Sequence, residues 1–293
     1  MKILSIGNFG HGWDGSICDE EHIAGALEEL GHEVTRVQRE GPLIWKSGDY
    51  DFTLIAQWDG YGDLSNLPKP VVYWAFDYQK EGQGWHERLV KEADLYLSKR
   101  IADSKYPNWQ WLSQDFAPEF LDKIDYPDND GIKQDIDVLF TGSYLDWATE
   151  RNETIKAVND KFNLVVHSVN DWPFLKRQPP IMDEGLPELY ARAKVILSID
   201  HTLEAGYWSD RNAQAMCCGA FVLTRYIPLM SSIFHSYIGY FYDIPSCLKS
   251  IQYWLENDED RENLAGYGYE YAQQELKVKN RVEDLLNIVQ GIL

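Results

Sequence analysis

The chain has 293 residues, of which 44% are hydrophobic and 14% aromatic, and its formal net charge is −20. This length and composition suit two α/β domains or one large one, and they exclude a chain that is disordered throughout. The acidic balance argues against a surface built to hold a polyanion, because nucleic-acid affinity comes mainly from Lys and Arg that neutralise phosphates, although it is compatible with one basic cleft.

The sequence lacks the marks of a membrane span, a signal peptide or a cysteine-based metal site. No stretch approaches the ~18 uninterrupted apolar residues of a membrane span, and the opening MKILSIG is predicted to be a buried strand. The cysteines are Cys18, Cys217, Cys218 and Cys247. Their spacing is typical of reduced thiols, so we expect a cytoplasmic protein without a metal site.

The first half of the chain alternates strand-like and helix-like segments. Apolar, β-rich runs predict strands over 2–7, 33–38, 51–58, 69–77 and 94–99. Helical spacing of apolar residues predicts a helix from residue 19 that stops at Gly31, and a second over 86–93. This alternation predicts a parallel, Rossmann-like sheet with a ligand crevice at the carboxyl ends of its strands.

The second half repeats the pattern after a break. Residues 117–134 are rich in Pro, Asp and Gly and have little periodicity, so the domain linker is placed there. Strands then follow over 135–143, 163–168, 194–200 and 220–224, helices over 150–160, 186–193 and 210–218, and helical sequence over 245–258 and 260–290. The chain is thus predicted to form two Rossmann-like domains, 1–120 and 135–293. Whether the last helix packs back on the first domain is left open.

Four stretches of the second half resemble one family in order and spacing. They are VLFTGSYLDWATERNETIKAV, LPELYARAKVILSI, DRNAQAMCCGAFVLT and SCLKSIQYWLENDEDRENLAGYGYEYA. Across residues 136–290 the chain resembles the group 1 (GT4-like) glycosyltransferases, in particular their CgeB-like branch, and VVYWAFDY in the first half is a weaker match. The resemblance implies the GT-B plan, in which two Rossmann-like domains face each other across a cleft. The first would bind the acceptor and the second a nucleotide-sugar donor.

Arg211 is the central candidate for donor binding. Ser209 or Asp210 suits the N-cap of the helix predicted over 210–218, which puts Arg211 in the first turn, where a cation opposes the helix dipole. A helix N-terminus binds anions, so an Arg is tolerated there when an anion lies in front of it. The resemblance supplies that anion, the donor's diphosphate. The alternative is an exposed Arg paired with Asp210.

The rest of the expected donor site comes from neighbouring segments. Arg151 opens a helix where the family has a basic residue that reaches the diphosphate; its alternative is a solvated Arg paired with a nearby Glu. Gly142 and Ser143 would let the backbone approach the nucleotide. The resemblance places Gly206, Tyr207, Trp208 and Ser209 in the loop that faces the sugar, and the donor-binding set is completed by the amides of Asn212 and Gln214.

Gln214 departs from the family. The broader family usually has a Glu here, the second of a Glu-x7-Glu pair that accepts hydrogen bonds from the ribose, and the first Glu would fall at Gly206. A Gln accepts only as a neutral, weaker group, and Glu204 stands two residues early. The departure leaves the donor open and motivates an alternative, a catalytically inactive GT-B protein that binds nucleotide or glycan. Gly219 is interpreted as the end of the helix.

Catalytic candidates come from the first half. The loop GNFGHGWDGS follows the first strand, and in GT-B enzymes this loop lies near donor and acceptor, which makes His11 and Asp14 candidates. Asp14 would act as general base if the reaction inverts the sugar, and Asp77 is its rival. Each carboxylate is equally explained as a loop group that bonds backbone N–H. Loop aromatics are frequent in this half, and two or three of them are expected to contact an acceptor.

The sequence therefore predicts a metal-independent hexosyltransferase with a UDP- or GDP-sugar as co-substrate and no required cofactor. Retention of configuration is implied by the resemblance, and Arg211, Arg151 and helix N–H groups would stabilise the leaving diphosphate. The acceptor is left open among a glycan, a small molecule, a protein and a modified base in DNA, as in phage-type base glycosylation. The oligomeric state is open, and a sugar epimerase on the same fold is a further alternative.

Overall fold

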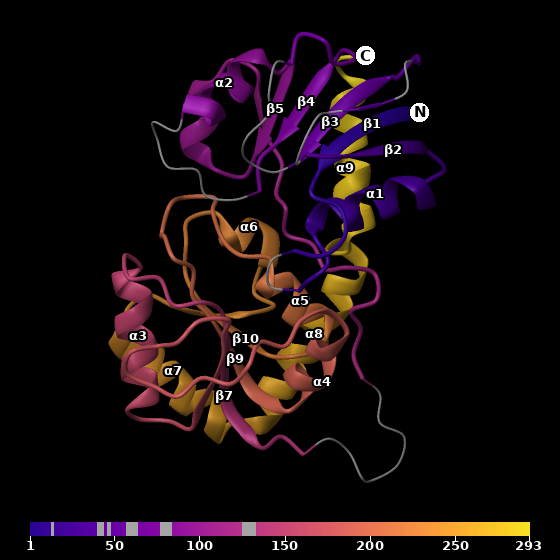
Figure 1. Cartoon of the computed structure of the whole chain (residues 1–293). Coiled ribbons are helices and arrows are strands. Elements are labelled where there is room, and N and C mark those ends of the chain that lie inside the picture. Colours follow the sequence, from indigo (N-terminus) through magenta and orange to yellow (C-terminus); the bar gives the residue numbers. More distant parts are fainter. Residues whose placement is uncertain (13–14, 40–43, 46–47, 57–63, 77–83, 125–132) are drawn as a thin grey trace. The chain divides into compact units, whose positions relative to one another are not determined.

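The chain folds into two compact units, each with its own parallel sheet (Figure 1). The computed structural model describes residues 1–293 except 13–14, 40–43, 46–47, 57–63, 77–83 and 125–132. Unit 1 comprises Met1–Gln114 and Val278–Leu293, and unit 2 comprises Asp115–Lys277. Each sheet is accompanied by helices that connect its strands, as the alternation in the sequence predicts.

Unit 1 contains a sheet of six parallel strands in the order β2-β1-β3-β4-β5-β6. The strands are β1 (Lys2–Gly7), β2 (Glu33–Gln38), β3 (Phe52–Ala56), β4 (Val71–Trp74), β5 (Leu95–Ser98) and β6 (Trp109–Trp111). Every residue of β3, β4 and β5 is buried, as expected for parallel strands covered on both faces. The three-residue β6 was not predicted, because so short a strand has no measurable alternation.

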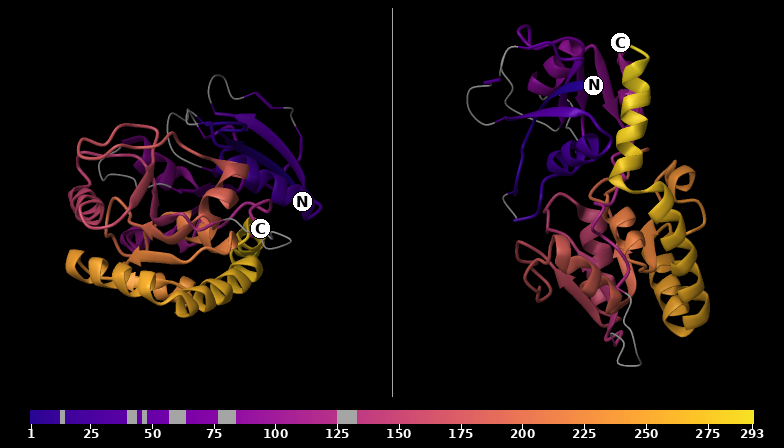
Figure 2. Two further views of the ribbon diagram at one scale, coloured as in Figure 1. Left: turned by 90° about the horizontal axis from the view of Figure 1, so that it is seen from below. Right: turned by 90° about the vertical axis from the view of Figure 1, so that its right-hand side faces the viewer.

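Helices of unit 1 come from both ends of the chain. They are α1 (Asp19–Glu29), α2 (Gly84–Glu92), the short 3-10 helix η1 (Ile101–Lys105) and α9 (Val278–Gln290). The closing helix α9 packs beside α1, and Figure 2 shows it in yellow along unit 1. It contributes a buried face of Val282, Leu285 and Val289. The first and the last segments of the chain therefore share one domain.

A break separates α9 from the preceding helix α8 (Asp258–Glu275), where the sequence indicates one helical stretch over 260–290. Ala117 donates its N–H to the carbonyl of Leu276 at 2.7 Å and forms a parallel bridge with Lys277. The Lys277 ammonium also donates to the carbonyl of Glu119 at 3.2 Å. These bonds replace the helical hydrogen bonds at the junction, and they join the two ends of unit 2.

Unit 2 contains a parallel sheet of five strands in the order β11-β10-β9-β7-β8. The strands are β7 (Ile136–Thr141), β8 (Leu164–His167), β9 (Ala193–Ser198), β10 (Val222–Arg225) and β11 (Gly239–Phe241). Its helices, besides α8 and the 3-10 turn η2 (Asp183–Gly185), are α3 (Thr149–Asn159), α4 (Leu186–Ala191), α5 (Arg211–Cys217), α6 (Met230–Phe234) and α7 (Ile244–Glu256). Neither β11 nor α6 was predicted, because both are too short to show a period.

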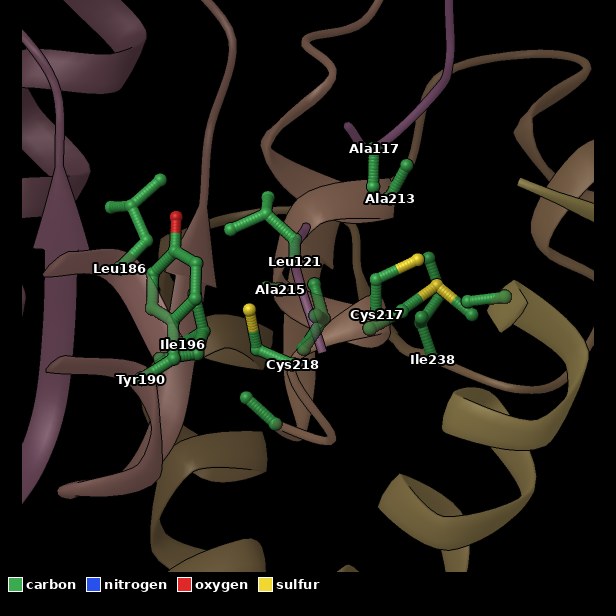
Figure 3. Packing of buried hydrophobic residues seen from close by; sticks show 14 of the residues in the cluster. Ala117, Leu121, Leu186, Tyr190, Ile196, Ala213, Ala215, Cys217, Cys218 and Ile238 are labelled. Atoms are coloured by element: carbon green, nitrogen blue, oxygen red, sulfur yellow. The ribbon is translucent and has the colours of Figure 1, made fainter. Parts of the chain in front are cut away.

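The core of unit 2 lies on both faces of this sheet. Alternate residues of β9 divide between the faces: Ile196 packs in one cluster, and Val195 and Leu197 in the other. Figure 3 shows the first cluster, in which the small residues Ala213 and Ala215 bring α5 close to the sheet. This close packing fixes the position of α5, including its first residue.

The carboxyl end of α5 is set by a glycine. Gly219 adopts φ +72°, a left-handed conformation that favours glycine, and its N–H bonds the carbonyl of Met216 at 2.9 Å, so its predicted role as the helix stop is confirmed.

Cys217 is a free, buried thiol, and burial raises its pKa to about 12, which keeps it protonated and unreactive at neutral pH.

The segment between the two sheets belongs partly to unit 2. A linker is predicted over 117–134 from the sequence, whereas unit 2 begins at Asp115 and buries Ala117 and Leu121 in its core. Within the part of the chain that the structure describes, no helix is both long enough and apolar enough to cross a lipid bilayer.

Candidate functional site

Charged and polar side chains gather at the carboxyl ends of the strands of unit 2. Gly142 directly follows β7, Asp200 lies two residues beyond β9, and Tyr226 follows β10. Helices α3 and α5 begin at this same edge, with Arg151 third in α3 and Arg211 first in α5. In open parallel sheets this is the edge where ligands bind, so it is the first place to look for a site in unit 2.

Arg211 lies across the end of β7. The carbon of its guanidinium is 5.2 Å from the centre of the Phe140 ring, and its Nη1 is 3.5 Å from the Ser198 hydroxyl. A Cβ on Gly142 would come within 3.0 Å of the Phe140 ring and 3.2 Å of Arg211 Nη2. The absence of a side chain at Gly142 therefore lets the guanidinium lie against the backbone after β7.

Arg151 is the second cation at this edge and is only 5% exposed. Its Nη2 donates to the carbonyl of Ser143 at 2.6 Å, and its Nε is buried without an acceptor among the described residues. Burial, together with repulsion from Arg211, lowers the pKa of Arg151 to about 10, against an opposing effect of Asp200. Arg151 thus remains charged at pH 7 and is close enough to Arg211 for the two to repel.

Neither arginine is neutralised by a partner. Within the described ranges, no carboxylate lies within 4.0 Å of either guanidinium. Asp210 bonds the side-chain amide of Gln214 at 2.5 Å instead of Arg211, and Glu150 pairs with Arg225 at 2.7 Å instead of Arg151. The two alternative interpretations from sequence, an exposed Arg211 paired with Asp210 and a solvated Arg151 paired with Glu, do not describe these side chains.

The start of α5 is capped by Ser209. Its hydroxyl accepts the N–H of Arg211 at 3.2 Å, and its own N–H donates to the Asp200 carboxylate at 2.8 Å. Asp210 precedes the helix but has helical φ and ψ and makes no capping bond. Of the two N-cap candidates from sequence, Ser209 therefore satisfies the first turn, while Asp210 holds Gln214.

Asn212 is buried without a hydrogen bond. It is 0% exposed, and neither the oxygen nor the nitrogen of its amide has a partner in the part of the chain that is described. The Thr224 hydroxyl in β10 is buried and unbonded as well. Leaving such groups unpaired costs about 1–3 kcal/mol each, so this edge carries polar groups that do not stabilise the fold.

The loop over 206–209 divides into two parts. The Tyr207 ring lies tilted against His201 with ring centres 5.2 Å apart, and the His201 ring meets the half-exposed Trp147 ring edge-on at 5.0 Å between centres. Trp208 is 0% exposed, its indole N–H donates to the Asp115 carboxylate, and its ring packs in the core. The Trp208 side chain is thus committed to the interior and is left out of the site that we propose below.

Gly206 explains one departure from the family pattern. It adopts φ +83°, a left-handed conformation that favours glycine, and its N–H bonds the carbonyl of Pro228 at 3.2 Å. A Glu at this position would strain the loop. The loop is therefore built in a form that does not accommodate the first Glu of the pair.

The catalytic candidates of the first half belong to unit 1. His11 is exposed and forms an antiparallel bridge with Ile17, whereas Asp14 and Asp77 lie outside the described residues. Their catalytic roles stay predictions. Among the residues described, no three His, Cys, Asp or Glu side chains are grouped closely enough to hold a metal ion.

Several groups at this edge were missed from the sequence. Asp200, which holds Ser209, ends the predicted strand 194–200, and a carboxylate at a strand's carboxyl end is a usable signal. Phe140, whose ring contacts the Arg211 guanidinium, belongs to an apolar strand, and nothing in that strand's sequence indicates a contact with a cation. The ion pair Glu150–Arg225 joins residues 75 apart in sequence, a pairing that a single sequence does not reveal.

The sequence and the fold of the chain match known proteins. Residues 150–287 match a family described as glycosyl transferase-like, a segment that includes both arginines. No curated protein matches the chain by sequence.

Three solved structures illustrate the likeness of fold. Sucrose-phosphate synthase of Thermosynechococcus elongatus is 11% identical, with a TM-score of 0.69 over 99% of this chain and 98% of that one. The Anabaena protein Alr3699/HepE in complex with UDP and glucose is 13% identical, with a TM-score of 0.66 over 99% and 100%. An α-glucosyltransferase in complex with UDP and a 13-mer DNA is 14% identical, with a TM-score of 0.66 over 99% of each chain.

The chain shares its fold with the GT-B glycosyltransferases. Residues 150–287 match the glycosyl transferase-like family, and the six-stranded and five-stranded parallel sheets have the GT-B fold. The predicted fold is thus confirmed, and the predicted resemblance to a glycosyltransferase family is confirmed over residues 150–287.

Proposed function

We propose that this protein is a glycosyltransferase that transfers a sugar from a nucleoside-diphosphate sugar, and that Arg151 and Arg211 bind the diphosphate. The observation that supports this most strongly is the pair itself. Two guanidinium groups, one almost fully buried, repel each other at the carboxyl edge of the sheet, and neither has a carboxylate partner in the described ranges. An uncompensated buried charge is costly, and a bound dianion would remove that cost.

A diphosphate suits this arrangement in charge and in geometry. Guanidinium groups donate two parallel hydrogen bonds to phosphate oxygens, which adds directional preference to the attraction. When the sugar–phosphate bond breaks, negative charge develops on the leaving diphosphate, and fixed cations stabilise it. The two arginines would thereby take the part that a metal ion has in other transferases, so the proposed reaction is metal-independent.

Neutral groups beside the arginines complete the proposed donor site. Asn212 offers an amide whose donor and acceptor are unused by the described protein. Gln214 is held by Asp210 through its nitrogen, which leaves its oxygen directed as an acceptor for a ribose hydroxyl. Ser143, Tyr207 and Ser209 line the loops next to these groups, and we include them in the donor site.

A UDP-hexose is the first donor to test, because the similar Anabaena protein was solved with UDP and glucose. Retention of configuration, with assistance from the donor's own phosphate, is the expected course. Asp14, Asp77 and His11 are kept as proposed catalytic groups of unit 1, the carboxylates as bases for an inverting reaction.

The experiment is a calorimetric titration of UDP, and separately of GDP, into the wild type and into Arg211→Ala and Arg151→Ala. Each variant should bind the nucleotide at least about tenfold more weakly, because it loses charge-assisted bonds to phosphate. Arg192→Ala is the matched control: Arg192 directly precedes β9 at the amino edge of the sheet and pairs with Asp135. Equal affinity in all variants, or no nucleotide binding by the wild type, would refute the proposal.

A binding protein without transferase activity is the second candidate, favoured by Gln214 in place of the family's Glu. Such a protein would bind UDP with the same dependence on Arg211. Incubation with UDP-glucose and quantification of released UDP separates the two, since only a transferase or hydrolase releases the nucleotide.

Transfer to a base in DNA is the third candidate, favoured by the fold of the similar α-glucosyltransferase solved with DNA. The net charge of −20 opposes it. Duplex binding that weakens steeply with added salt would support this candidate, because phosphate contacts release counterions. We expect no such binding.

A further inference from the structure

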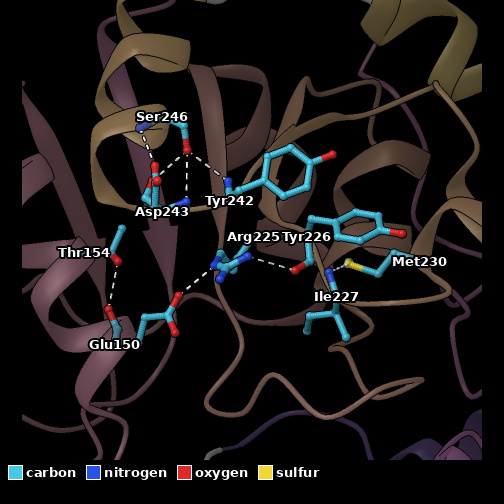
Figure 4. Close-up of polar contacts among 9 residues, drawn as sticks. All are labelled: Glu150, Thr154, Arg225, Tyr226, Ile227, Met230, Tyr242, Asp243 and Ser246. Carbon is cyan, nitrogen blue, oxygen red and sulfur yellow. Dashed lines mark hydrogen bonds and ion pairs between the residues drawn. The ribbon is translucent and has the colours of Figure 1, made fainter.

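Three tyrosines lie together at the carboxyl ends of β10 and β11. Tyr226 follows β10, Tyr240 belongs to β11, and Tyr242 follows it. The ring of Tyr226 is 5.6 Å from that of Tyr240 and 5.3 Å from that of Tyr242, measured between ring centres. We call these three residues the tyrosine platform; Figure 4 shows Tyr226 and Tyr242 with their hydroxyls on the same side.

The side chains of the platform are available to a ligand. Tyr242 is 59% exposed, and Tyr226 is half-buried. The Tyr240 hydroxyl donates to the carbonyl of His235 at 3.0 Å. The hydroxyls of Tyr226 and Tyr242 form no hydrogen bond within the described part of the chain, so they can bond a ligand while their rings contact it.

The backbone under Tyr226 is fixed from two sides. Its N–H donates to the carbonyl of Phe241 at 2.9 Å, and its carbonyl accepts from Nη1 of Arg225 at 3.1 Å. Arg225 is itself held by Glu150 at 2.7 Å (Figure 4). The backbone position of Tyr226 is therefore set by α3 and β11 as well as by its own strand.

The backbone under Tyr242 is fixed by the start of α7. Its N–H donates to the Ser246 hydroxyl at 3.0 Å. Ser246 and Asp243 bond each other reciprocally as a capping box (Figure 4). The backbone that carries the exposed Tyr242 ring and the half-buried Tyr226 ring is thus fixed before any ligand arrives, which reduces the entropy lost on binding.

The platform belongs to the same edge of the sheet as the proposed donor site. Glu150, which holds Arg225, is the immediate neighbour of Arg151 in α3. The chain of contacts therefore runs from the cation of the donor site, through one ion pair, to the backbone of Tyr226. The acceptor that receives the sugar from the donor site must therefore bind near this edge.

Charge next to the platform disfavours a phosphate-bearing ligand. Arg225 is neutralised by Glu150. The Asp243 carboxyl is exposed, and its hydrogen bonds from Ser246, with a smaller contribution from Arg225, lower its pKa, so it is negative at neutral pH. A nucleic-acid backbone would meet a net negative flank here.

We propose that the tyrosine platform binds a pyranose ring of a neutral carbohydrate acceptor. The C–H face of such a ring is apolar and suits the faces of Tyr226 and Tyr242, and its hydroxyl rim suits their unbonded phenol groups. The inference rests on the proposed function, since it names the class of acceptor for the same transferase.

The test uses saturation-transfer NMR and titration with three neutral probes: cellotetraose, maltotetraose and chitotetraose. At least one should bind the wild type in the presence of UDP. Tyr242→Ala and Tyr226→Ala should each weaken that binding about tenfold, as truncation of an aromatic anchor does. Tyr226→Phe with Tyr242→Phe keeps the rings and should lose only the part that comes from the hydroxyls.

Tyr267→Ala is the matched control, because Tyr267 is 61% exposed on α8 and outside the platform. This variant should bind the probe as the wild type does. The proposal is overturned if no probe binds, or if Tyr242→Ala and Tyr267→Ala bind it equally.

UDP affinity measured in parallel separates the two proposals. Platform variants that bind UDP normally but lose the oligosaccharide support both. A wild type that binds UDP and no oligosaccharide overturns the acceptor proposal alone, and a wild type that binds neither UDP nor GDP overturns the proposed function.

Discussion

Unit 1 and unit 2 each bury a group of polar side chains, and these two groups differ in how they are satisfied. In unit 1 the Tyr73 hydroxyl and His86 Nδ1 share a hydrogen bond of 3.1 Å, and the Asp103 carboxylate accepts from Tyr96 at 2.6 Å and from Ser98 at 2.7 Å. In unit 2 the carboxyl edge of the sheet holds two arginines that have no carboxylate partner, and the buried Asn212 amide that has no hydrogen bond, among the described residues. Internal pairing indicates a stabilising role, and its lack indicates groups reserved for a ligand.

The largest effect is expected for Arg151→Met, which removes one of the two arginines of unit 2 that lack a carboxylate partner. Donor turnover should fall by about 10²–10³-fold, the usual cost of removing one group that stabilises a leaving anion. The melting temperature should change little, because the relief of repulsion with Arg211 offsets the loss of the hydrogen bond to the Ser143 carbonyl. UDP release and thermal denaturation measure the two quantities, and a fall in both would show that Arg151 is structural.

The next largest effect is the pH dependence of stability that comes from His86, which belongs to the hydrogen-bonded network of unit 1. Burial lowers the pKa of His86 to about 4, with Asp103 opposing, against 6.5 for the unfolded chain. The unfolded state therefore binds a proton between pH 6.5 and 4 that the folded state does not, so stability falls as the pH drops through this window. The loss approaches about 3 kcal/mol at pH 4.

Urea denaturation at a series of pH values measures this loss. His86→Gln should be less stable than the wild type at pH 7 and should show a flatter profile below pH 6.5. An unchanged profile would mean that other groups cause the acid sensitivity.

Asp103→Asn should cost about 1–3 kcal/mol of stability, because the amide replaces an acceptor that serves two hydroxyls in a buried network. Chemical denaturation measures it. The exposed Asp160→Asn is the control, and equal midpoints for the two variants would contradict the role assigned to the network.

A pair of asparagine substitutions gives the smallest effect and the sharpest contrast. Asn108 donates to the carbonyls of Val90 and Ala93 at 2.8 and 2.9 Å, so Asn108→Leu should destabilise by about 1–3 kcal/mol. Asn212 has no such bonds, so Asn212→Leu should be nearly neutral for stability while it weakens UDP binding. Similar loss of stability in both variants would remove the distinction between the two regions.

The order of strands and helices could be predicted from the sequence because it depends on local sequence signals. Apolar runs such as 2–7 and 194–200 mark buried parallel strands, and Gly219 marks the end of α5 by its left-handed conformation. Short elements such as β11 lack a period, and the break before α9 depends on Ala117, which is distant in sequence. The division into units was therefore less visible than the elements themselves.

Only part of the candidate site could be predicted from the sequence. Arg211 stood out because a cation in the first turn of a helix is unfavourable without an anion. Trp208 was included because its loop faces the sugar in the family, although its indole is buried against Asp115. The platform residues Tyr226 and Tyr242 follow short strands, and only the paired backbone of β10 and β11 brings their rings together.

The bond between Ala117 and Leu276 has a further consequence. Because the chain enters and leaves the second domain at two hydrogen-bonded neighbours, residues 115–277 form a closed insertion within the first. Excised at these points, the insertion would keep its ends together and retain Arg151, Arg211 and the tyrosines on one polypeptide. A gene fragment of that length is thus a natural reagent for mapping nucleotide contacts by NMR.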